Sequence, residues 1–221
     1  MRRRMVWSIG SLALMLALIM MSARNVRGED EPPFTLTTFT VPTTGSNSWG
    51  ITAGPDSNLW FAESGASKIG RITPSGTITG FSIPTPNSGA SSITPGPDGN
   101  LWFTEDSVSK IGRITPSGTI TEFPVPTTSE VVAEDETSGP YDIVSGPDKN
   151  LWVSTYGGHP VDSSSVFRVA PDGRIIDYDT ISGYTIAEIA AGPDGAIWFT
   201  SEDTIGRLEF PVFYQYLPLA Q

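Results

Sequence analysis

The chain has no cysteine and only one histidine among its 221 residues. The absence of cysteine excludes disulfides, thiolate metal sites and catalysis by a thiol. A single histidine leaves little room for chemistry that depends on imidazole groups. Any catalytic or metal site in this protein must therefore be built mainly from carboxylates, hydroxyls or amides.

Basic residues are also scarce, since 13 Lys and Arg stand against 24 Asp and Glu, for a net charge of −11. This balance argues against a nucleic-acid partner, which requires a basic face. Glycine (23) and proline (19) are plentiful, whereas charged residues make up only 17% of the chain. This composition is typical of an all-β domain with many tight turns and enough apolar residues for one core.

The apolar run from Val6 to Met21 is shorter than the roughly 20 residues of a membrane-spanning helix. It follows the basic start Arg2–Arg4, as in an export signal. We therefore interpret residues 1–28 as a signal peptide, with an uncleaved N-terminal anchor as the alternative. Either reading places the remainder outside the cytoplasm, as a secreted or cell-envelope protein.

One stretch, Gly-Pro-Asp-Gly-Asn-Leu-Trp-Phe-Thr-Glu at residues 96–105, recurs three more times in related form. Its tryptophan falls at positions 60, 102, 152 and 198, in steps of 42, 50 and 46 residues. A period in this range, with short strands and turn residues, predicts one four-stranded propeller blade per repeat. The four tryptophans are expected to pack between blades, with a carbohydrate platform as the alternative.

The first full repeat predicts four strands with turn residues between them. The inner strand is expected at residues 51–53, the second at 58–63, the third at 68–73 and the outer one at 77–83. Pro-Asp and Pro-Ser-Gly sequences supply the turns. The second repeat, residues 93–125, copies this pattern, and the third and fourth follow it from Ile143 and Ile189.

Both ends of the repeat region, residues 34–209, are irregular. Residues 29–33 are a polar lead-in, and residues 34–43 are predicted as a spare outer strand. The fourth repeat has no outer strand of its own, and residues 210–221 form an apolar tail. The all-β propeller is therefore either a closed four-bladed ring, completed by residues 34–43, or an open arc. An open arc could pair with a second chain to make a larger ring, with the tail as an interface.

Two loops interrupt the pattern of the third repeat. Residues 128–139 form an acidic insertion, which we interpret as a solvated loop, with a calcium or magnesium site as the alternative. The hairpin loop at residues 156–165 contains His159, the only histidine.

The units Gly-Pro-Asp-Gly-Asn-Leu-Trp-Phe-Thr-Glu and Lys-Ile-Gly-Arg-Ile-Thr-Pro-Ser-Gly-Thr-Ile-Thr-Glu-Phe-Pro resemble the blades of the virginiamycin B lyase family, over about residues 34–209. That family consists of streptogramin-inactivating enzymes, so the resemblance extends to antibiotic resistance. It implies a seven-bladed propeller, relative to which this chain is truncated. It also implies a Mg²⁺-dependent C–O elimination that opens a cyclic depsipeptide ester, in which a base removes the proton next to the carbonyl.

The resemblance transfers unevenly to single residues. Glu63 and Glu105 occupy the position of a family metal ligand, so they are the candidate Mg²⁺ ligands. The alternative is that each faces solvent or pairs with a lysine. Tyr141 and His159 are the remaining catalytic candidates, although a packing role and a mobile surface role are their alternatives. The positions of the family's catalytic histidines hold Trp49, Ser91, Tyr141 and Ala187, so the family's base is not matched.

Three functions stay open at this point. The first is a carbon–oxygen lyase of the streptogramin lyase type with Mg²⁺. The second is a non-catalytic extracellular binding or scaffold propeller, with a small molecule or peptide at the axial face. The third is a lactonase-like metal-dependent hydrolase.

Overall fold

A computed structural model describes residues 35–125, 139–155 and 163–209. The chain divides into two units, Met1–Thr38 and Phe39–Gln221, and all the sheets belong to the second. Within the first, residues 35–38 have no regular secondary structure. No helix among the described residues is long and apolar enough to cross a membrane. The prediction of a signal peptide or anchor at residues 1–28 and the apolar tail at 210–221 lie outside the described residues.

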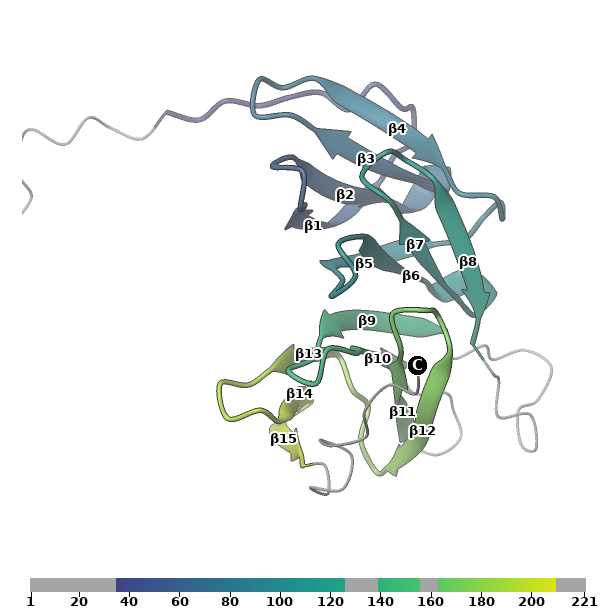
Figure 1. The fold of residues 1–221 in the computed structure, drawn as a ribbon, viewed down its shortest axis with the longest axis vertical. Helices are drawn as coiled ribbons and strands as arrows, with labels where there is room; N and C mark the ends of the chain where they lie inside the picture. Colours follow the sequence, from purple (N-terminus) through teal and green to yellow (C-terminus); the bar gives the residue numbers. More distant parts are fainter. Residues whose placement is uncertain (1–34, 126–138, 156–162, 210–221) are drawn as a thin grey trace, which may run out of the picture. The chain divides into compact units, whose positions relative to one another are not determined.

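The described residues of the second unit form four antiparallel sheets, each built from strands that are consecutive in the chain (Figure 1). The first three sheets have four strands and the last has three. We call these sheets blades 1 to 4. Blade 1 comprises β1 (Ser48–Ala53), β2 (Leu59–Glu63), β3 (Lys68–Ile72) and β4 (Ile78–Ser82), and blade 2 comprises β5 (Ala90–Pro95), β6 (Leu101–Glu105), β7 (Lys110–Ile114) and β8 (Ile120–Pro124). Blade 3 comprises β9 (Pro140–Ser145), β10 (Leu151–Thr155), β11 (Ser163–Val169) and β12 (Ile175–Ser182), and blade 4 comprises β13 (Glu188–Ala191), β14 (Ile197–Ser201) and β15 (Thr204–Leu208).

These blades confirm the predicted all-β propeller repeat, and the strands fall close to their predicted positions. Short 3₁₀ turns, η1 (Ser64–Ala66) and η2 (Asp106–Val108), follow β2 and β6. The inner strands β1, β5, β9 and β13 pack on one another in that order. Among the described residues β13 packs on β9 without substantial packing on β1, an arrangement that the open arc, one of the two predicted alternatives, allows.

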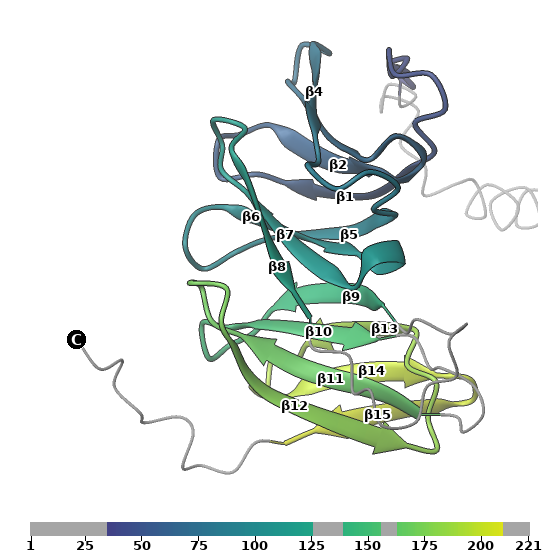
Figure 2. The ribbon, with the colours of Figure 1, turned by 90° about the vertical axis from the view of Figure 1, so that its right-hand side faces the viewer.

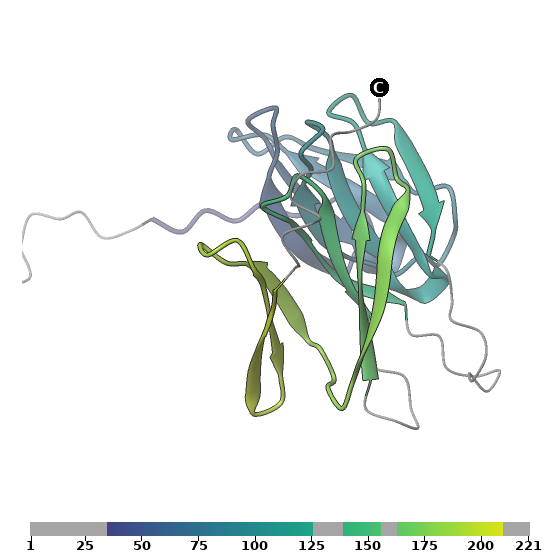
Figure 3. The same cartoon turned by 60° about the horizontal axis from the view of Figure 1, so that its bottom comes forward.

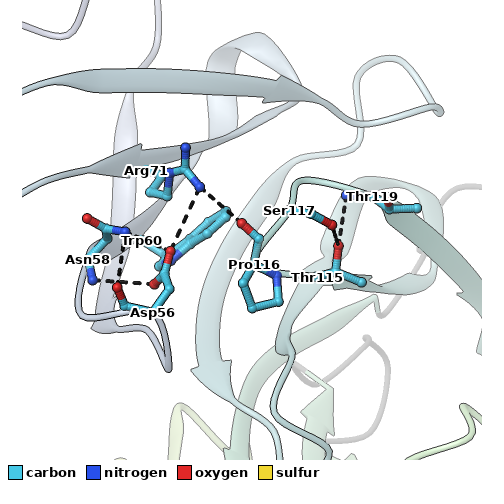
Figure 4. Close-up of polar contacts among 8 residues, drawn as sticks. All are labelled: Asp56, Asn58, Trp60, Arg71, Thr115, Pro116, Ser117 and Thr119. Atoms are coloured by element: carbon cyan, nitrogen blue, oxygen red, sulfur yellow. Dashed lines mark hydrogen bonds and ion pairs between the residues drawn. The ribbon is translucent and has the colours of Figure 1, made fainter.

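A polar motif explains why each blade repeats Asp, Trp and Arg. In blade 1 the Trp60 indole Nε1 donates to Asp56 Oδ1 at 2.9 Å, which ties the turn to β2. The Arg71 guanidinium lies over the Trp60 ring, 5.4 Å from its centroid. Arg71 Nη1 also donates to the Pro116 carbonyl of blade 2 at 3.0 Å (Figure 4). The motif therefore stabilises the turn, the blade and the junction with the next blade.

Blade 2 repeats this arrangement against blade 3. Trp102 Nε1 donates to Asp98 Oδ1 at 3.1 Å, and Arg113 Nη1 donates to the Pro171 carbonyl at 3.2 Å. The turn aspartates were predicted as turn residues alone, and the structure adds their role as acceptors for tryptophan and arginine. Partly buried hydrogen bonds of this kind fix the orientation of a side chain that packing alone would leave free to rotate.

The strands of successive blades follow one another in chain order (Figure 2). Apolar side chains from facing blades form three clusters in the blade junctions. Trp60 belongs to the first, Trp102 to the second and Trp152 to the third, and all three are buried. This confirms the prediction that these tryptophans pack between blades. Outer-strand rings add to the packing, because Phe81 stacks on Trp60 with centroids 5.4 Å apart.

The prediction of a strand at residues 34–43 is wrong for the described part, because residues 35–47 contain no strand. A strand requires hydrogen-bonded pairing with a partner edge, and the described sheets include no pairing with this segment. The Phe39 ring instead occupies the space that a Cβ on Gly76 would fill, in the turn before β4. Among the described residues blade 4 therefore has three strands, and the edge of β15 is unpaired there (Figure 3).

Candidate functional site

The candidate site is a cleft of about 370 Å³ at the end of the blades where the inner strands begin. The inner strands of all four blades run in the same direction relative to their second strands, so their first residues converge there. The cleft is lined by Asn47, Trp49, Gly50, Ser64, Ser91, Ser92, Asp106, Tyr141, Asp142 and Glu188. We call this the axial cleft.

One repeat position supplies a graded series of side chains to the axial cleft. This position directly precedes the isoleucine of each inner strand. It holds Gly50 in blade 1, Ser92 in blade 2, Asp142 in blade 3 and Glu188 in blade 4. Sequence reasoning missed Asp142 and Glu188. The signal was present in the four repeats, since this position becomes larger and more acidic along the chain while the isoleucine that follows it stays constant.

Asp142 joins three blades at the floor of the axial cleft. Its Oδ1 accepts from Ser92 Oγ of blade 2 at 2.6 Å and from the Ile143 backbone N–H at 2.8 Å. Its Oδ2 accepts from the Ile189 backbone N–H of blade 4 at 2.9 Å. Because both oxygens are already engaged, this carboxylate positions the inner strands.

Tyr141, a predicted catalytic candidate, lies in the axial cleft and is half-buried. Its backbone carbonyl accepts from Thr104 Oγ1 at 3.1 Å and from Ser91 Oγ at 3.4 Å. Thr104 Oγ1 in turn accepts from the Ser92 backbone N–H at 3.0 Å. This network holds the Tyr141 backbone at the junction of blades 2 and 3. His159, the other candidate, lies outside the described residues, as does the acidic insertion except for Gly139.

The axial cleft is acidic and aromatic. Asp106, Asp142 and Glu188 contribute three carboxylates, and Trp49 and Tyr141 contribute rings, while the described lining residues include no lysine or arginine. Such a surface favours amide N–H groups, hydroxyls and cations over anions. Glu188 is exposed, and its backbone N–H donates to Thr200 Oγ1 at 3.3 Å. Its carboxylate is therefore available for a ligand in the axial cleft.

Glu63 and Glu105, the predicted metal ligands, do not line the axial cleft. Each is fully buried at the end of the second strand of its blade, so the two occupy the same place in successive blades. No amine, amide or hydroxyl group of the described residues donates a hydrogen bond to either carboxyl. The predicted alternative, a solvent-facing carboxylate, is wrong for both because neither has accessible surface.

The Glu105 carboxyl faces Glu122 of the outer strand, and this pairing determines its protonation. Burial, repulsion from the Glu122 carboxylate and a hydrogen bond to it raise the pKa of Glu105 to about 8, and the Lys110 ammonium only partly offsets this. Burial opposes ionisation of Glu122 as well, but hydrogen bonds from Thr85 and Glu105 bring its pKa below its usual value. The pair therefore shares a proton near neutral pH, with Glu105 as donor and Glu122 as acceptor.

A Mg²⁺ ion requires several oxygen ligands in octahedral geometry. The described residues contain no group of three or more His, Asp or Glu side chains placed to hold a metal. At Glu105, the nearby Lys110 ammonium lies 3.6 Å from Glu122 Oε2, a position that disfavours a second cation. The described surroundings of Glu63 and Glu105 thus do not fit the metal site that the sequence resemblance implied.

Comparisons with known proteins agree on the nature of the repeat. Residues 28–132 match the model of the Virginiamycin B lyase family. The chain is similar to a catalytically inactive virginiamycin B lyase from Staphylococcus aureus solved with quinupristin, at 38% identity and a TM-score of 0.68 over 77% of this chain and 55% of that one. It is also similar to a streptogramin B lyase structure, at 33% identity and a TM-score of 0.66 over 77% of this chain and 54% of that one.

A more distant similarity concerns the fold alone. A structure described as a putative gluconolactonase is 17% identical, with a TM-score of 0.58, over 75% of this chain and 60% of that one. A comparison with curated protein sequences gives no match. The chain spans little more than half the length of the two lyase structures.

Proposed function

Since the blade repeats of this chain are those of the virginiamycin B lyase family, we propose that the protein is an exported propeller whose axial cleft binds a cyclic depsipeptide of the streptogramin B class. The observation that carries this proposal is the composition of the axial cleft. All four blades contribute to it, and its lining includes Trp49, Ser91 and Tyr141. The sequence resemblance places these three residues at the positions of the family's catalytic histidines. The proposal thus keeps the family's ligand site at the same place in the fold, with different chemical groups in it.

The lining of the axial cleft suits binding better than elimination. Elimination requires a base within hydrogen-bond reach of the proton next to the carbonyl. Among the described ionisable groups of the cleft, Asp142 is engaged by three donors. Tyr141, Asp106 and Glu188 remain as groups that contact the ligand, and Trp49 offers a ring on which an aromatic or apolar ligand group stacks.

The opening of the ester is the second candidate function, and the same experiment decides it. The purified protein is incubated with quinupristin, which was bound in the related lyase structure. Binding is measured by isothermal titration, with Mg²⁺ and with chelator, and the products are analysed by liquid chromatography and fragmentation. Elimination leaves the mass unchanged but linearises the ring, whereas a lactonase-type hydrolysis adds the mass of one water.

The expected result is saturable binding without conversion, and binding weakened at least tenfold by Tyr141→Ala. Ile176→Lys, which changes an exposed residue of the outer strand β12, is the control for non-specific effects. Mg²⁺-dependent linearisation would instead establish lyase activity, with Tyr141 and His159 as the first residues to substitute. If quinupristin does not bind to folded protein, the proposed ligand class is wrong.

Export rests on the basic start and the apolar run within residues 1–28. Expression in a bacterial host, followed by fractionation and N-terminal sequencing, tests this part. The small residues Ala23 and Gly28 are the candidate cleavage positions. Protein outside the cytoplasm that begins directly after one of them is the expected result. Full-length protein in the soluble cytoplasmic fraction would contradict it.

A further inference from the structure

The two ends of the array of blades expose apolar side chains whose counterparts in the middle blades are buried. At the start, Leu36 is 82% exposed, and Ile51 and Leu59 are exposed as well. At the end, Ile205 on β15 is 72% exposed. Together with Phe39 these make up most of the large exposed apolar side chains of the described residues. Exposed apolar surface gathered in this way indicates an interaction site.

The exposed face at the end of the array is an incomplete copy of the faces inside it. In blade 1, Trp60 is covered by both Arg71 and the outer-strand Phe81, and blade 2 has the same stack of Arg113 and Phe123 on Trp102. In blade 4, the Arg207 guanidinium lies 5.6 Å from the Trp198 centroid, but among the described residues no outer-strand ring completes the stack. What blade 4 lacks in the described part of the chain is one β-strand with a phenylalanine.

Residues 35–40 have the sequence of that missing strand. Phe39 occupies the same repeat position as Phe81 and Phe123. Its ring fills the space beside Gly76 just as Phe81 does beside Gly118 and Phe123 beside Gly173. In each of the other two cases the phenylalanine belongs to the outer strand of the preceding blade. Phe39 is therefore seated on blade 1 as if a preceding blade were present.

The exposed face of blade 1 matches the exposed face of blade 4. In the first cluster, Ile93 and Leu101 of blade 2 pack with Trp60 and Ile69 of blade 1. The residues at these positions on the two free faces are Ile51 and Leu59 in blade 1, and Trp198 and Ile205 in blade 4. The same pairing of side chains can thus be made once more, between the end of one array and the start of another.

We propose that two copies of this chain close into an eight-bladed ring, in which residues 35–40 of each copy form the fourth strand of blade 4 of the other. The repeat fixes the register, because Lys68 lies opposite Ser82 and Ile69 opposite Phe81 in blade 1. By equivalence, Thr40 lies opposite Thr204, Phe39 opposite Ile205 and Leu36 opposite Leu208. Phe39 then stacks on Trp198, and Arg207 reaches the Pro74 carbonyl as Arg71 reaches that of Pro116.

A second copy fits these surfaces better than closure within one chain. Four and eight blades both lie within the observed range for propellers, but eight require a turn of only about 45° per blade, whereas four require about 90°. In the described residues β13 packs on β9 and not substantially on β1, so blade 4 does not reach the seat of Phe39. Two-fold symmetry makes both junctions identical, and the added strand satisfies the free edge of β15. This inference is independent of the proposed ligand.

The mass of the purified protein in solution, measured by light scattering, is the first test. The expected mass is twice that of one chain. Ile205→Lys is expected to halve it, by placing a charge in the proposed junction, and Ile205 is exposed enough in the single chain for the fold to tolerate the change. Ile176→Lys, at another exposed isoleucine, is expected to leave the dimer intact.

Cysteine pairs then distinguish a second copy from closure within one chain, and the absence of natural cysteine makes them specific. A Thr40→Cys chain mixed with a Thr204→Cys chain is expected to form a disulfide-linked pair under mild oxidation. Lys68→Cys with Ser82→Cys, the equivalent positions in blade 1, is the control for the geometry and should link within one chain.

Three outcomes would overturn the proposal. A chain that carries both Thr40→Cys and Thr204→Cys tests closure within one copy. If this chain is a monomer and forms the disulfide within itself, the ring closes by itself. A monomer without any such link would show that these faces remain free or await another partner. A dimer without the mixed disulfide, while the control pair does form, would show that the copies associate through another surface.

Discussion

Blades 1 and 2 have nearly the same sequence but different surroundings, and the difference shows what a repeat does and does not encode. Residues 67–79 and 109–121 are identical. The strand pairing is the same as well, from Leu59 opposite Ile72 in blade 1 to Leu101 opposite Ile114 in blade 2. Yet Leu59 is 45% exposed whereas Leu101 has no accessible surface. Local sequence determines the blade, and the neighbouring blade determines whether its face becomes core.

The largest expected effect separates these two leucines. Leu101→Ala removes a fully buried side chain, and we expect it to lower the free energy of unfolding by about 2–5 kcal/mol. Leu59→Ala, measured in the Ile205→Lys background so that no second copy covers blade 1, is expected to cost less than about 1 kcal/mol. Urea denaturation at equilibrium measures both values. Equal costs would show that the two blades have the same environment after all.

The buried glutamates provide a second comparison, because Glu105 faces Glu122 whereas the equivalent partner of Glu63 is Gly80. Burial and the neighbouring Glu122 carboxylate raise the pKa of Glu105 to about 8 from its ordinary value of 4.5. Between these pH values the native state holds a proton that the unfolded state has lost. The stability contributed by this proton is fully present below about pH 4.5 and is lost as pH rises towards 8, with a slope of up to about 1.4 kcal/mol per pH unit.

Glu105→Gln is therefore expected to flatten the fall in stability between pH 5 and 8, since the neutral amide can still donate to Glu122. The measurement is a series of denaturation curves at several pH values. Glu63→Gln is the matched control for removing a buried carboxyl from the same strand position. An unchanged slope in Glu105→Gln would contradict the assigned proton sharing between Glu105 and Glu122.

The smallest effect concerns one turn position. Ser57 has φ of +62°, and its counterpart in blade 2 is Gly99, with φ of +75°. A non-glycine residue in this left-handed region costs about 1 kcal/mol or more, partly offset by the greater entropy of unfolded glycine. Ser57→Gly is expected to raise the free energy of unfolding by roughly 0.5 kcal/mol, and Gly99→Ser to lower it by a similar amount. If calorimetry shows that Ser57→Gly lowers the free energy of unfolding, or that Gly99→Ser raises it, the backbone explanation is refuted.

The candidate site was less predictable than the fold. The position of Tyr141 at the axial face followed from the repeat, but the role of Asp142 did not. Its three donors come from Ser92, Ile143 and Ile189, which belong to three different blades. Contacts between side chains far apart in the sequence depend on how the blades are arranged, and no local pattern reports them. The same holds for Glu105, whose partner Glu122 lies on the outer strand.

The metal prediction failed to find support for a related reason. A repeated Trp-Phe-Thr-Glu sequence places Glu63 and Glu105 at the same strand end. Whether such a carboxylate reaches the axial cleft depends on the face of the strand from which it projects. In both blades the glutamate lies on the same side as the preceding phenylalanine, because alternate residues of a strand share a face. It is buried there and does not line the axial cleft.

The sequence by itself determined the all-β class, the four repeats, the strand order within each blade and the turns, because these follow from local periodicity and from residues with restricted backbone angles. Only the tertiary structure decided that residues 35–43 form no strand, that Glu63 and Glu105 are buried, and that Asp142 joins three blades. A strand forms only when a partner edge is present, and a side chain is buried only when a neighbour covers it. Both conditions are set by the packing of whole blades, which no single repeat contains.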